Sequence, residues 1–96
     1  MKDKKEILTL LRNHKSYLKE KYGVSQIGLF GSYARGDTTD KSDVDILVEF
    51  ERPVGLDYLR LASELEELIG MKVDLVTKKG IKQRYLPYVE KDLEYA

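Results

Sequence analysis

The chain has 96 residues, enough for one domain, and we treat 1–96 as a single domain. Apolar residues make up 42% and charged residues 35% of the sequence, a balance that excludes both a disordered chain and a membrane protein. Seventeen Lys and Arg residues balance seventeen Asp and Glu residues, so there is no strong signal for nucleic-acid binding. There is no cysteine, which excludes disulfides and zinc–thiolate sites. We therefore expect a cytoplasmic protein that does not enter a membrane.

The first half of the chain predicts one helix, one strand and a polar loop. Apolar residues recur at helical spacing and predict a helix from about Asp3 to Lys21. Val24–Phe30 reads as a strand. Residues 31–42 are rich in Gly, Ser, Thr and Asp, which predicts a loop with a helical turn near Ser32–Arg35.

The second half predicts two more strands and two helical regions. In chain order these are a strand over Asp43–Glu51, an amphipathic helix from Leu56 to Ile69 and a strand over Val73–Val76. The remainder, 79–96, is expected to be mainly helical, with a break or a restart of the helix at Pro87 and an extended piece at 94–96. The helix between the second and third strands suggests a right-handed crossover. The fold class expected is α+β (a two-layer α/β arrangement), with a small mixed sheet and helices packed on one face.

Acidic residues occur inside two of the predicted strands. In the second strand Val44 and Ile46 share one face, while Asp43 and Asp45 project from the other. Asp74 lies between apolar residues of the third strand. Aspartate is depleted in strands, so a solvated sheet face explains these residues less well than a shared site does. Three carboxylates with no His or Cys beside them suit Mg²⁺ or Mn²⁺.

The loop before the second strand carries groups that suit phosphate. Gly31 directly follows the first strand and allows close backbone approach, and Ser32 adds a hydroxyl. Arg35 is expected either to reach a phosphate or to brace the loop against Asp37 or Asp40.

The combined motif resembles the DNA polymerase β-like nucleotidyltransferase superfamily. Gly31-Ser32, a ten-residue gap, Asp43-Val44-Asp45 and the later Asp74 match its signature, and the fuller string resembles the minimal nucleotidyltransferase (MNT) branch. The resemblance covers nearly the whole chain. It implies the polymerase β-like fold and an antitoxin that transfers AMP from ATP to a tyrosine of a HEPN-domain toxin.

The resemblance also assigns roles to individual residues. Asp43 and Asp45 match the two aspartates that hold two metal ions, and Asp74 matches the third, which bridges one metal to the attacking hydroxyl and can act as its base. Gly31 and Ser32 match the pair that grips the outer phosphates. The nucleotide-binding set that we expect is Gly31, Ser32, Arg35 and Ser42.

Two alternative functions remain open at this point. The chain could neutralise its toxin by masking it without catalysis, or it could modify a small-molecule acceptor. Larger relatives enclose the acceptor with a helical domain, so we expect a partner protein or a homodimer to supply that wall here. We expect His14 to be structural, and the C-terminal tyrosines to serve either the core or a binding surface.

Overall fold

In the computed structural model, which describes residues 2–96, two helices occupy the N-terminal region where one was expected. They are α1 (Lys4–Asn13) and α2 (Lys15–Tyr22). Asp3 caps α1 because its side chain accepts a hydrogen bond from the Glu6 amide at 2.9 Å. His14 breaks the helix, and its Nδ1 donates to the Leu10 carbonyl at 2.9 Å. His14 is half-buried at this junction, which agrees with a structural role.

The remaining elements follow the expected order. They are β1 (Val24–Phe30), α3 (Gly31–Arg35), β2 (Val44–Phe50), α4 (Asp57–Ile69), β3 (Val73–Thr77), α5 (Leu86–Asp92) and β4 (Glu94–Tyr95). The C-terminal prediction is wrong over residues 79–85, which form turns and irregular backbone rather than helix. Pro87 lies in the first turn of α5, where a missing amide proton breaks no helical hydrogen bond, so of the two expected effects, a break or a restart, the restart is found.

The four strands form one mixed sheet in the order β3-β2-β1-β4. β1 runs antiparallel to both β2 and β4, whereas β2 and β3 are parallel. The parallel pair requires a crossover connection, which α4 provides. The predicted mixed sheet is therefore confirmed.

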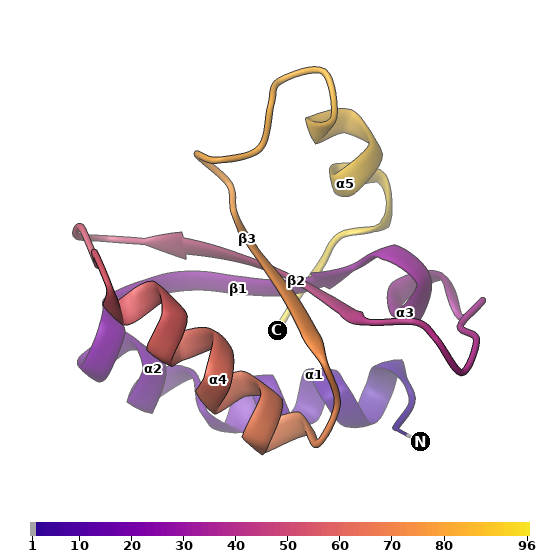
Figure 1. Ribbon diagram of the computed structural model, residues 1–96, viewed down its shortest axis with the longest axis horizontal. Coiled ribbons are helices and arrows are strands. Elements are labelled where there is room, and N and C mark those ends of the chain that lie inside the picture. Colours follow the sequence, from indigo (N-terminus) through magenta and orange to yellow (C-terminus); the bar gives the residue numbers. More distant parts are fainter. Residues whose placement is uncertain (1) are drawn as a thin grey trace.

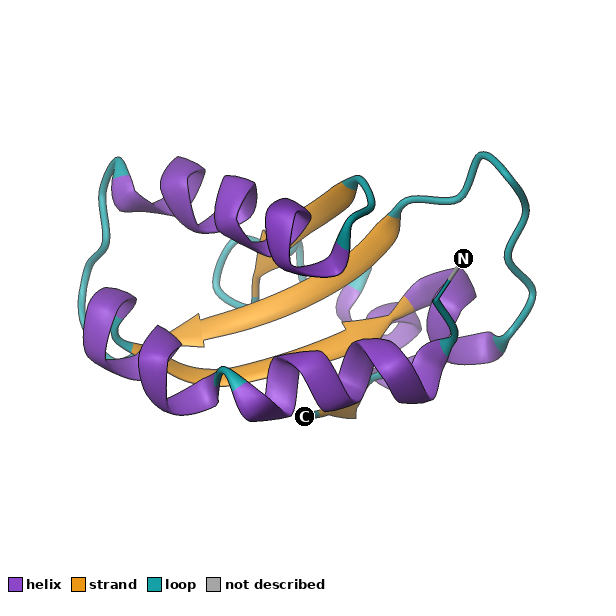
Figure 2. Ribbon diagram, turned by 90° about the horizontal axis from the view of Figure 1, so that it is seen from below, coloured by secondary structure: helices purple, strands orange, loops and turns teal. Residues whose placement is uncertain are grey.

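The three longer helices cover one face of this sheet. Figures 1 and 2 show α1, α2 and α4 side by side on that face, with α5 on the other side of the sheet near α3. Ile27 and Leu29 of β1 and Ile46 of β2 point toward the helices and are at most 1% exposed. Leu65 of α4 meets them in the same core cluster. Burial of this face fixes which side chains the opposite face displays.

The outer edge of β3 is closed by side chains from α4. The Val73 amide donates to the Glu66 carboxylate at 3.0 Å, and the Tyr58 hydroxyl donates to the Leu75 carbonyl. An open strand edge is a template for pairing with another chain, and these two bonds occupy part of it. None of the helices within residues 2–96 is both long and apolar enough to span a bilayer.

Candidate active site

Strand register brings two of the three predicted carboxylates together. The parallel pairing of β2 with β3 aligns Asp45 with Asp74. Adjacent strands lie about 4.8 Å apart, and side chains of aligned residues project from the same face. This is the face opposite the core helices, because Val44 and Ile46 on either side of Asp45 are fully buried against the core. Asp45 and Asp74 therefore form a neighbouring pair on the open face.

Gly31 places the predicted phosphate loop directly against Asp45. Its φ of +73° lies in the left-handed region. A Cβ added to Gly31 would overlap Oδ2 of Asp45 and come within 3.0 Å of its Cγ. Tyr33, only 4% exposed, anchors the short helix α3 in the core just beyond. Glycine is therefore required here both by the backbone conformation and by the close approach of the carboxylate.

The surroundings of Asp45 perturb its ionisation. Burial, followed by the negative charges of Asp74 and Asp43, raises the pKa of Asp45 to about 6 from its ordinary value of 3.8, although Arg35 opposes the shift. The Asp45 side chain is half-buried, whereas Asp43 and Asp74 are exposed. A divalent cation bound at this face would favour the charged form and reverse the shift. The electrostatics thus suit a cation-binding, oxygen-only set of donors.

Asp43 lies at the margin of this pair. It precedes the first residue of β2 and contributes to the field at Asp45, but its side chain is exposed. Among residues 2–96, no three His, Cys, Asp or Glu side chains are grouped tightly enough to hold a metal ion as they stand. Like charges at close range repel, which is a physical reason for three carboxylates to remain apart. The three-aspartate metal site remains a prediction.

Arg35 braces the loop, one of the two roles expected for it. Its Nε donates to Asp37 at 2.9 Å and its Nη1 donates to Asp92 of α5 at 2.9 Å. The hydrogen bond to Asp37, and then the one to Asp92, raises the pKa of Arg35 further above its ordinary value. The predicted partner Asp37 is therefore found and Asp40 is not. Asp92 was missed because it lies 57 residues away in the sequence.

The two predicted serines differ in their surroundings. Ser32 opens α3 beside Gly31, and its carbonyl accepts from the amides of Gly36 and Asp37. Ser42 closes a turn in the loop, because its hydroxyl accepts from the Thr39 amide at 2.8 Å. Ser32 thus lies next to the Gly31–Asp45 contact, whereas the Ser42 hydroxyl stabilises the turn of the loop.

Tyr58 is a neighbour of the site that the sequence did not suggest. Its hydroxyl reaches the Leu75 carbonyl, one residue beyond Asp74. Burial, and then the charge of Asp74, raises the pKa of Tyr58 above its ordinary value. No spacing signal links Tyr58 to Asp74, since α4 packs beside β3 only in the folded chain.

The chain is similar in sequence to known nucleotidyltransferases. The sequence family "Nucleotidyltransferase domain" matches residues 11–96. The protein adenylyltransferase MntA of Thermococcus cleftensis is 45% identical over 91 residues, which cover 94% of this chain and 92% of that protein. The family match spans α3, β2 and β3 and includes every site residue described above.

Solved structures share the fold. A minimal nucleotidyltransferase structure superposes with a TM-score of 0.78 at 35% identity, covering 97% of this chain and 95% of that one. A toxin–antitoxin crystal structure with AMP-PNP superposes with a TM-score of 0.70 at 25% identity, covering 98% of this chain and 72% of that one. The expected polymerase β-like α+β fold is confirmed, and the chain belongs to the nucleotidyltransferase-domain family, in its minimal nucleotidyltransferase branch.

Proposed function

We propose that the protein is an antitoxin that transfers AMP from ATP to a tyrosine hydroxyl of a HEPN-domain toxin. The observation that carries this proposal is the contact of Gly31 with Asp45, which in turn aligns with Asp74. This contact joins the loop expected to hold phosphate to the carboxylates expected to hold metal. The similarity to the adenylyltransferase MntA supports the choice of AMP, and the toxin–antitoxin structure supports the kind of partner.

The transfer that we propose is an in-line displacement at the α-phosphorus of ATP. The tyrosine oxygen forms a bond to this phosphorus, the bond to the bridging oxygen of the β-phosphate breaks, and pyrophosphate leaves. The phenolic proton passes to the Asp74 carboxylate, which lies exposed on the open face. The backbone and hydroxyl of Gly31 and Ser32 orient the outer phosphates. Such a reaction depends mainly on positioning and charge stabilisation.

The donor set fits two Mg²⁺ ions, with Mn²⁺ as an alternative. Asp43, Asp45 and Asp74 offer only carboxylate oxygens, the ligands that these hard cations prefer. When bound, the ions would neutralise the phosphate charge that develops during displacement. Asp43 immediately precedes β2 and lies two residues from Asp45 along the chain.

Transfer of label from ATP tests the proposal. The purified protein is incubated with Mg²⁺, the toxin encoded beside it, and ATP labelled either on the α- or on the γ-phosphate. We expect the toxin to acquire only the α-label, and mass spectrometry to locate one or more AMP groups on a tyrosine. Absence of α-label on the toxin, under conditions where ATP binds, would reject the proposed acceptor.

Matched variants test the residues. The double substitution of Asp43 and Asp45 by Asn should lower transfer by at least about 100-fold, because the divalent cations that these carboxylates would hold, and that would offset the phosphate charge, are then lost. Asp40→Asn, an exposed acid in the same loop, should leave transfer unchanged. If the double variant still transfers AMP at the normal rate, these carboxylates are not the catalytic site.

Toxin masking without catalysis is the second candidate function. It is favoured by exposed apolar side chains on the surface, since Tyr88 is 75% and Leu56 87% exposed. Growth rescue separates the two functions. If the Asp43/Asp45 double variant neutralises the toxin as well as the unmodified protein does, masking suffices and AMP transfer is not needed.

A further inference from the structure

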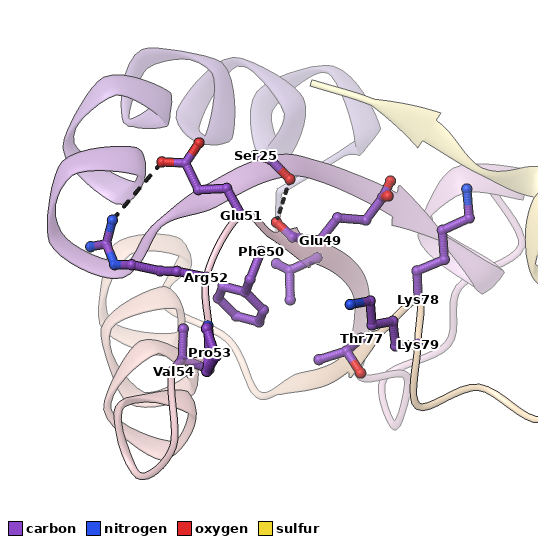
Figure 3. Close-up of a pocket in the computed structure, with 11 residues that line it drawn as sticks. Ser25, Glu49, Phe50, Glu51, Arg52, Pro53, Val54, Thr77, Lys78 and Lys79 are labelled. Carbon is purple, nitrogen blue, oxygen red and sulfur yellow. Dashed lines mark hydrogen bonds and ion pairs between the residues drawn. The ribbon is translucent and has the colours of Figure 1, made fainter.

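A pocket lies at the end of the sheet opposite the end that carries Asp45 and Asp74. It has a volume of about 740 Å³ and is formed by the last residues of β2, the segment 51–54 that follows β2, and the turn that follows β3. Figure 3 shows these segments surrounding an open hollow. Ligand pockets are commonly of this size and often lie beyond the carboxyl ends of parallel strands.

This pocket is separate from the candidate active site. Asp45 is the second residue of β2 and Asp74 the second residue of β3. The pocket begins three residues further along each strand, at the paired residues Val48 and Thr77. Three residues of extended strand span roughly 10 Å. The strands that connect the two sites therefore keep a group bound in the pocket away from the carboxylates.

One wall of the pocket is apolar. Val48 is fully buried and Phe50 is half-buried, with the Phe50 ring facing the hollow (Figure 3). Pro53 and Val54 extend this wall along the segment after β2. Flat aromatic side chains next to aliphatic ones form a surface on which a ring system can stack.

The opposite rim is cationic. Figure 3 shows the Lys79 side chain pointing toward Phe50, while the Lys78 side chain points away from Phe50. Within residues 2–96 neither lysine takes part in an ion pair, whereas Arg52 pairs with Glu51 at 3.9 Å. The remaining acid of the rim, Glu49, accepts a hydrogen bond from the Tyr95 hydroxyl at 3.0 Å. Lys79 thus brings positive charge against an apolar wall, an arrangement that favours an anion.

We propose that this pocket is a second binding site, distinct from the transfer site, for a nucleoside monophosphate. Its ring system stacks on Phe50 beside Pro53 and Val54, and its phosphate pairs with Lys79. The site needs both parts of the ligand, because the apolar wall and the ammonium group lie on opposite sides of one hollow.

Titration with AMP followed by amide NMR tests this site without any toxin or transfer reaction. In the absence of divalent cations, AMP should shift the amide signals of residues 50–52, 54 and 77–79. Lys79→Ala should weaken binding about tenfold, the usual consequence of losing a charge-assisted contact. Lys82→Ala removes an exposed lysine outside the pocket and should leave the affinity unchanged. Adenosine and inorganic phosphate, titrated separately, should each bind at least about tenfold more weakly than AMP.

Each other outcome would overturn the assignment. If AMP shifts only the signals of residues 31–35, it binds at the transfer site alone. If Lys79→Ala binds AMP as tightly as the unmodified protein, the lysine does not hold the phosphate. If adenosine or phosphate alone binds as tightly as AMP, the site does not recognise a nucleoside monophosphate. Since Lys79 is exposed, its removal should not unfold the chain, and the amide spectrum itself verifies the fold.

Discussion

Replacing Gly31 by alanine is expected to disturb the site far more than replacing another glycine of the same backbone conformation. Gly31 and Gly36 have φ values of +73° and +85°, and alanine at either position would suffer the strain of the left-handed region, about 1–2 kcal/mol. At Gly36 nothing lies within 4 Å of the added Cβ. At Gly31 the Cβ would overlap the Asp45 carboxylate, and pushing that side chain off its rotamer adds about 1 kcal/mol.

Urea unfolding, monitored by circular dichroism, measures both effects. Gly36→Ala should lower the free energy of unfolding by about 1–2 kcal/mol and Gly31→Ala by about 2–3 kcal/mol. In an Asp45→Ala background the carboxylate is absent and only the Cβ of residue 45 remains, 3.2 Å from the added Cβ, so the cost of Gly31→Ala should fall toward that of Gly36→Ala. This double-mutant comparison isolates the contact between loop and strand. Equal costs for the two glycine substitutions in the unmodified background would show that Gly31 does not approach Asp45 closely.

Three further predictions concern charge. Because the pKa of Asp45 is raised from 3.8 to about 6, the folded state holds the carboxyl proton more tightly than the unfolded state does. The free energy of unfolding should therefore fall as the pH rises through this interval, and Asp45→Asn should abolish that fall in urea titrations. For Glu64, burial raises the pKa, but hydrogen bonds, first that from Lys21, lower it to about 2. The contribution of Glu64 to the free energy of unfolding should therefore be present above pH 4.5 and disappear toward pH 2. Glu64→Gln should lower the free energy of unfolding at neutral pH by about 2 kcal/mol. Asp92→Asn removes the carboxylate charge of α5 that pairs with Arg35. Because this ion pair is partly exposed, the free energy of unfolding should change by less than about 1 kcal/mol, while hydrogen exchange of the α5 amides should accelerate.

The strands and the long helix α4 could be predicted because a local pattern determines them. Alternation in β2 assigned Val44 to the core and Asp45 to the opposite face, and the structure places both as expected. The break at His14 could not be seen, because the apolar positions of α1 and α2 continue one helical stripe, with Leu11 and Leu18 both buried. Periodicity reports which face is buried and is insensitive to a single turn that preserves that face.

The part of the site that escaped prediction depends on contacts between distant segments. Asp92 meets Arg35, and Tyr58 meets the backbone beside Asp74, only after α5 and α4 have packed. The overprediction of helix in residues 79–85 has a related cause. None of these residues is buried, so the segment has no apolar face whose burial would offset the entropy lost in ordering a helix.

The division of the sheet into two faces explains why a domain of this size would act on a protein. The long helices bury one face of the sheet, and the Asp45–Asp74 pair lies on the opposite face. Figure 1 shows α5 on that side of the sheet, near α3. A small molecule gains affinity from a pocket that surrounds it, whereas a folded partner brings its own binding surface and can hold a tyrosine in position. Asp74 is exposed, and the base that we propose would have to be exposed to meet a hydroxyl of another molecule. This exposure favours a macromolecular acceptor over a free small molecule, on grounds independent of the similarity to known antitoxins.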